Sequence, residues 1–93
     1  MEKFKEAFRD YLEREKGYSA HTVLAYCADL DSFHGFLISE FDQDNLLEVN
    51  YSQIRSWIVC LVDAGLSTSS VNRKVASLRA FYKFLLNYFI SLF

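Results

Sequence analysis

The chain has 93 residues, of which 52% are hydrophobic and 17% aromatic, and its formal net charge is −2. A chain of this size and composition forms one small globular domain with a real core, which excludes a disordered protein. The sequence lacks an apolar run near the roughly 20 residues that span a bilayer, and its start is too charged for a signal peptide. We therefore expect a cytoplasmic protein without membrane contact.

The first two predicted elements are amphipathic helices. A helix over about residues 3–16 ends at Gly17, and its apolar face consists of Phe4, Ala7, Phe8, Tyr11 and Leu12. A helix over about residues 20–38 is capped by Ser19, and its apolar positions are Val23, Tyr26, Cys27, Leu30, Phe33 and Leu37. Because about three residues separate the two helices, they are expected to form an antiparallel hairpin.

Residues 39–49 are acidic and lack a regular pattern, which predicts a connector to a third helix. Asn50 can cap that helix, with Gln53 reaching back to it as in a capping box. The helix is expected to bury Ile54, Trp57, Ile58 and Leu61. Gly65 then stands where a left-handed residue closes a helix.

A fourth helix is predicted over about residues 68–90, with Ser67 as its cap. Its inward stripe consists of Val71, Val75, Leu78, Tyr82 and Leu85, and the largely opposite face carries Arg73, Ala76, Ser77, Ala80 and Lys83. The predicted fold is thus all-α, with four main helices in two antiparallel hairpins.

The negative total charge hides an uneven distribution along the chain. Residues 1–63 carry six Lys or Arg against twelve Asp or Glu, whereas residues 64–93 carry four against none. The surface that faces a partner is therefore expected in the last third, although a basic helix face is also compatible with simple solvation. Cys27 and Cys60 both fall inside predicted helices as reduced, small hydrophobes, so no disulfide, metal site or cofactor is expected.

Two segments of the chain carry extended motifs. Residues 11–37 follow the pattern YL..EKG.S..T...Y..DL..F..FL. Residues 65–85 follow GLS..S.NR.LSALR.FY.FL, with the Ser-Ala step appearing as Ala76-Ser77. Both segments resemble the core-binding domain of tyrosine recombinases of the phage-integrase or Xer type. An amphipathic helix can imitate part of either pattern, but both in this order and separation are specific, and the resemblance covers about residues 4–86.

The resemblance implies a SAM-like bundle of two crossed hairpins that forms one jaw of a clamp around a double-stranded DNA half-site. The second and fourth helices then face the major groove. In this family the other jaw is catalytic, and it supplies an arginine, a lysine, a His-x-x-Arg pair, a further histidine and the tyrosine nucleophile. Neither His21 nor His34 is followed three residues later by arginine.

Residues 1–93 are accordingly expected to be a single DNA-binding domain, separated from its catalytic domain and not an enzyme by itself. The partners that the resemblance implies are DNA, the protein's own C-terminal catalytic domain and neighbouring recombinase subunits. The apolar end of the chain fits this expectation, with any exposed Phe84, Phe89 and Phe93 covered by such a partner.

The resemblance places DNA contacts on the second and fourth helices, whose first turns present free N–H groups and a positive dipole end. The expected contacts are Ser19, His21, Thr22, Tyr26, Ser69, Ser70, Arg73, Lys74, Ser77, Arg79 and Lys83. Arg73 leads because guanidinium suits guanine and phosphate, and the small Ser77 is expected to allow close approach to the groove. Simpler roles remain open: Ser19 as an ordinary cap, Tyr26 as a packed aromatic and Lys74 as a solvated charge.

A helical protein-interaction domain, such as an adaptor, is the alternative function. It rests on the acidic first two thirds and the apolar end of the chain. DNA binding that weakens steeply with rising salt separates the two hypotheses.

Overall fold

The computed structural model describes residues 1–92, which contain helices, turns and no strand. The elements in chain order are α1 (Glu2–Asp10), a π-helical turn η1 (Tyr11–Glu15), α2 (Ala20–Phe41), a 3-10 turn η2 (Leu46–Glu48), α3 (Tyr51–Asp63) and α4 (Thr68–Ile90). The predicted all-α fold with four main helices is confirmed. The first helix differs in its last turn, which widens so that the Lys16 N–H bonds the carbonyl of Tyr11, five residues back.

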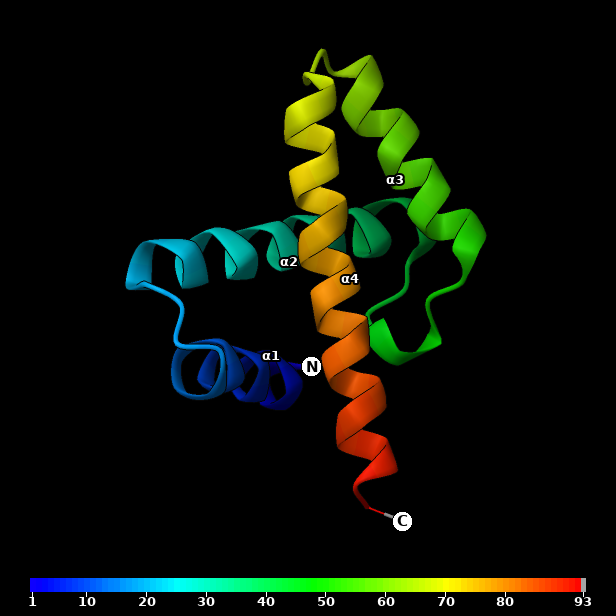
Figure 1. The fold of residues 1–93 in the computed structure, drawn as a ribbon. Coiled ribbons are helices and arrows are strands. Elements are labelled where there is room, and N and C mark those ends of the chain that lie inside the picture. The colour runs from blue at the N-terminus through cyan, green and yellow to red at the C-terminus, as the bar shows by residue number, and fades with distance from the viewer. Residues whose placement is uncertain (93) are drawn as a thin grey trace.

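The helices form two crossed hairpins (Figure 1). The segment α1–η1 runs antiparallel to α2, and α3 runs antiparallel to α4. The long helices α2 and α4 cross and pack against each other near the middle of the molecule. Their crossing joins the two hairpins.

One core runs through all four helices. Its buried side chains are Phe8, Leu12, Val23, Leu30, Phe33, Leu37, Leu46, Trp57, Leu78, Phe81 and Leu85. Aromatic edge contacts connect the elements: the rings of Phe8 and Phe81 lie 5.2 Å apart, and those of Phe33 and Trp57 lie 5.1 Å apart. Neither hairpin therefore has a complete core of its own.

The predicted ends of α3 are confirmed. The Gln53 N–H donates to Asn50 Oδ1 at 3.0 Å while the Asn50 N–H donates to Gln53 Oε1 at 3.1 Å, which is a complete capping box. Gly65 has φ +91°, and the Leu66 N–H returns to the carbonyl of Leu61 at 3.2 Å. This is the left-handed closure that turns the chain directly into α4.

Helix α2 ends three residues later than the sequence pattern indicated. Asp42 takes the left-handed conformation, with φ +51°, and the Gln43 N–H bonds the carbonyl of Leu37 at 3.2 Å. Aspartate tolerates this conformation better than most residues, so the helix closes here without a glycine. The irregular connector begins only after this turn.

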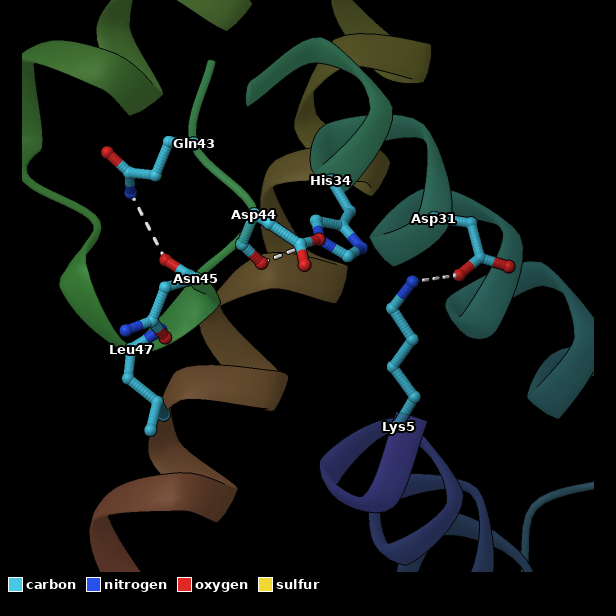
Figure 2. Close-up of polar contacts among 7 residues, drawn as sticks. All are labelled: Lys5, Asp31, His34, Gln43, Asp44, Asn45 and Leu47. Carbon is cyan, nitrogen blue, oxygen red and sulfur yellow. Dashed lines mark hydrogen bonds and ion pairs between the residues drawn. The ribbon is translucent and has the colours of Figure 1, made fainter. Parts of the chain in front are cut away.

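The connector is held by polar contacts that Figure 2 shows. His34 Nε2 lies 2.8 Å from Asp44 Oδ1 and 2.9 Å from the Asp44 carbonyl, and Gln43 Nε2 donates to the Asn45 carbonyl at 3.1 Å. The Leu47 N–H donates to Asn45 Oδ1 at 2.9 Å. In the same view, an ion pair of 2.8 Å between Lys5 and Asp31 joins α1 to α2.

The expectation that a partner covers exposed phenylalanines at the end of α4 does not apply to Phe84 and Phe89, because both pack within the domain. Phe84 and Phe89 are half-buried, with their rings 5.7 Å from Phe8 and 5.8 Å from Phe4. Phe93 lies outside the described residues. The exposed apolar side chains on this stretch are instead Leu86, Ile90 and Leu92.

Both cysteine side chains are free, and they differ in exposure. Cys27 is half-buried against the core and Cys60 is exposed, so only Cys27 packs as a small hydrophobe. Within residues 1–92, none of the helices combines the length and the apolar character needed to cross a membrane.

Candidate nucleic-acid interface

The start of α4 is organised by its cap. Ser67 Oγ accepts the Ser70 N–H at 3.2 Å and donates to Ser70 Oγ at 3.1 Å. Ser69 is exposed and Ser70 half-buried. The remaining N–H groups of a first helical turn have no acceptor within the helix, so this end favours an anion.

The start of α2 is built in the same way. Ser19 Oγ accepts the Thr22 N–H at 3.3 Å and lies 3.1 Å from Thr22 Oγ1, which confirms Ser19 as a cap. His21 is exposed. Tyr26 packs its ring 5.6 Å from that of Tyr18, and burial, followed by the neighbouring Tyr18, raises the pKa of Tyr26. Tyr26 therefore packs against Tyr18, and because Tyr26 is half-buried, part of its ring stays at the surface.

A buried carboxylate lies where α2 crosses α4. The Asp29 side chain is 2% exposed and accepts four hydrogen bonds from α4. Arg73 forms a two-pronged pair with it, Nη1 to Oδ2 at 3.0 Å and Nη2 to Oδ1 at 3.2 Å. Lys74 Nζ donates to Oδ1 at 3.1 Å, and Ser77 Oγ donates to Oδ2 at 2.7 Å.

The exposure of these partners decides what they can reach. The Arg73 side chain is 49% exposed while the Lys74 side chain is 19% exposed. Arg73 thus stays accessible to a ligand, whereas Lys74 is neither a free solvated charge nor fully available. Two cations share one carboxylate, so the group keeps an excess of one positive charge.

The expectation for Ser77 is wrong. Ser77 is 0% exposed, and its hydroxyl is used by Asp29, so it cannot give a DNA groove close access to α4. Arg73 likewise does not stand alone opposite the core, because it lies at the edge of α4 that meets α2. The physical reason is the same for both: the buried Asp29 draws polar partners toward the helix crossing.

Arg79 and Lys83 are exposed on α4 and have no ion-pair partner among the described residues. They border a shallow, mainly apolar groove whose other lining residues are Ile54, Val75, Leu78, Tyr82 and Leu86. Residues 64–93 contain no acidic side chain, so neither cation has an acidic neighbour on its own helix.

Figure 1 shows how the helices that carry these residues are arranged. Helix α2 begins at one end of the crossing hairpins and α4 begins at the top. The hydrogen bonds of Asp29 join α2 to α4. The structure thus brings together Arg73, Lys74 and Ser77, but it keeps the start of α2 apart from the start of α4. In this view α1 and α3 lie outside the corner between the first halves of α2 and α4.

Asp29 is the functional candidate that residue-by-residue reasoning missed. The available signal was an acidic residue among the apolar positions of residues 20–38, next to Leu30. Among residues 1–92, His, Cys, Asp and Glu side chains do not gather in groups that could hold a metal ion.

Comparison with known proteins identifies the family of this arrangement. Residues 6–87 match the family model described as phage integrase, N-terminal SAM-like domain. The chain belongs to this family. The SAM-like domain of tyrosine recombinases generally binds DNA and is not by itself the catalytic part of the enzyme.

Relatives of this SAM-like domain include several proteins named tyrosine recombinase XerC. The one from Pediococcus pentosaceus is 41% identical over 78 residues, which are 84% of this chain and 26% of the relative. The one from Oceanobacillus iheyensis is 39% identical over 85 residues, or 91% and 28%. The chain therefore spans little more than a quarter of the length of these relatives. No solved structure matches the chain.

Proposed function

We propose that this SAM-like domain grips one half-site of double-stranded DNA through α2 and α4 during DNA integration or recombination. The single observation that supports this most is the distribution of charge on α4. Arg73, Arg79 and Lys83 reach the surface of a segment without any acidic residue, although the whole chain is negative. Exposed cations on a helix without acidic side chains favour contact with DNA phosphates.

The contacts that we propose follow from the positions of the side chains. The capped starts of α2 and α4 would each receive a phosphate on backbone N–H groups, with His21, Thr22, Ser69 and Ser70 adding donors. Arg73 would supply its unused N–H groups at the corner between the helices.

We further propose that residues 1–93 form one domain of a larger recombinase and that catalysis belongs to another part of that protein. The XerC relatives, which are more than three times as long as the matched region, support this proposal. The partners would then be DNA, the catalytic domain of the same protein and neighbouring recombinase subunits, in the cytoplasm. This domain would use no cofactor.

Salt-dependent binding to duplex DNA tests the proposed interface. The isolated chain should bind with a dissociation constant on the order of 10⁻⁴–10⁻⁶ M at physiological salt, which is the range of non-specific binding. Lys83→Ala should weaken binding and reduce the slope of log K against log salt by about 0.9, because one phosphate contact is lost.

Lys3→Ala is the matched control, because it removes the same charge from another exposed helical lysine, on α1. This variant should keep the affinity and slope of the wild type. Equal losses for both variants would show that net charge, and not the α4 surface, determines binding.

An interaction domain for another protein is the second candidate. It is favoured by Leu86, Ile90 and Leu92, which are 60%, 61% and 63% exposed at the end of α4. If the chain shows no salt-sensitive DNA binding, this candidate is favoured over the DNA-binding function.

A further inference from the structure

We infer that Asp29 is a positioning residue of the proposed DNA interface, holding the Arg73 guanidinium so that a phosphate meets it in one orientation. This inference rests on the proposed DNA-binding function and names a residue of α2 that does not itself touch DNA. The carboxylate is 2% exposed, so its influence on a ligand must pass through its α4 partners.

Hydrogen bonds to the Asp29 carboxylate hold the Arg73 guanidinium in place. Each Asp29 oxygen accepts two hydrogen bonds: Oδ1 from Arg73 and Lys74, and Oδ2 from Arg73 and Ser77. A planar guanidinium held by two parallel bonds loses most of its rotational freedom before any ligand arrives. Guanidinium has five N–H groups, and the bonds to Asp29 involve only two of its nitrogens.

The number of cations argues against a purely structural role. A buried carboxylate needs one cation to offset its charge, and the hydroxyl of Ser77 adds a further short bond of 2.7 Å. The second cation is surplus to that need. Arg73 also remains 49% exposed, whereas Lys74 is largely covered. Lys74 therefore neutralises the Asp29 carboxylate, and Arg73 stays accessible to a phosphate.

Arg73→Lys separates orientation from charge. Lysine keeps the positive charge but lacks the planar guanidinium with which arginine can bond both carboxylate oxygens and a phosphate at once. We expect binding to a mixed-sequence duplex of about 30 base pairs to weaken roughly fivefold, because a side chain must be newly ordered, while the salt slope stays unchanged. Wild-type affinity for Arg73→Lys would overturn the inference.

A double-mutant cycle tests the same point through Asp29. Arg73→Ala should weaken binding about tenfold at 0.1 M salt in the wild type and no more than about threefold in Asp29→Asn, where the arginine is no longer held. Lys83→Ala should cost the same factor in both backgrounds. Asparagine keeps the shape of the side chain and an acceptor for Ser77, and thermal melts check that each variant is folded.

The outcomes distinguish this inference from the proposed function. If neither Arg73→Ala nor Lys83→Ala changes binding, the DNA interface itself is wrong. If Lys83→Ala weakens binding but Arg73→Ala has equal effects with Asp29 and with Asn at position 29, the interface stands and the positioning role is overturned. If Asp29→Asn does not fold, Arg73→Lys in the native background decides.

Discussion

The buried carboxylate of Asp29 determines how the positive charge of α4 is distributed. It binds Arg73 and Lys74 together, so the four cations of residues 64–93 divide into a held pair and the freely exposed Arg79 and Lys83. The held pair has fixed geometry and reduced net charge, whereas the exposed pair keeps its full charge and its mobility. The DNA surface that we propose would therefore combine an oriented contact with sequence-independent attraction.

A second buried polar contact, made by Tyr82, gives a pH-dependent prediction. Its hydroxyl donates to the Leu46 carbonyl at 2.9 Å, and burial raises the pKa of Tyr82 above its ordinary value. Because the folded state holds this proton more tightly than the unfolded state, the stabilisation is complete below pH about 10 and is lost as pH rises through the folded pKa. We expect the free energy of unfolding to fall above pH about 10.

Tyr82→Phe isolates that effect. The variant should be less stable by about 0.5–1.5 kcal/mol at neutral pH, since the bond to Leu46 is lost, and its stability should decline less steeply above pH 10. Urea denaturation between pH 7 and 11 measures both changes. Tyr51→Phe is the control, because Tyr51 is 79% exposed, and it should follow the wild type. Parallel alkaline declines for wild type and Tyr82→Phe would contradict the assignment.

At the scale of elements, helix ends could be predicted from the sequence where their signals are local. Asn50 and Gln53 lie three positions apart, and Gly65 follows its helix directly, so a short window contains the whole motif. Asp42 closes α2 with the same backbone conformation, but aspartate is a weaker signal for it than glycine, and the predicted end of that helix was three residues short.

The glycines of α2 and of the α3–α4 turn should respond in opposite directions to alanine. Gly65→Ala places a side chain at φ +91° and should destabilise the domain by about 1–2 kcal/mol. Gly35 lies inside α2 with open space around the added Cβ, so Gly35→Ala should stabilise by about 0.5–1 kcal/mol. Thermal melts should move by a few degrees down and up respectively. A stabilising Gly65→Ala would mean that the turn does not need its left-handed residue.

At the scale of the whole molecule, contacts between helices could not be predicted from periodicity. Asp29 lies 44 positions from Arg73 and 48 from Ser77, so each looked like an isolated polar residue on its own helix. The projection of α4 therefore placed Ser77 outside when the crossing with α2 makes it part of the interior. The family resemblance predicted the crossed hairpins directly. The hydrogen-bond partners of single side chains could not be predicted, because they depend on where the helices cross.

The shared core predicts that the two hairpins unfold together. Trp57, the sole tryptophan, is 2% exposed on α3 and contacts Phe33 of the other hairpin, and Phe81 of α4 contacts Phe8 of α1. Separating the hairpins would expose both contacts, so neither hairpin is expected to stay folded alone in a domain of this size.

Tryptophan fluorescence and far-ultraviolet circular dichroism should give the same urea midpoint. Phe33→Leu should lower both midpoints equally, although Phe33 lies in the first hairpin and Trp57 in the second. Two separate midpoints, or a fluorescence change that leaves the dichroism transition in place, would show that the α3–α4 hairpin is stable without α1 and α2.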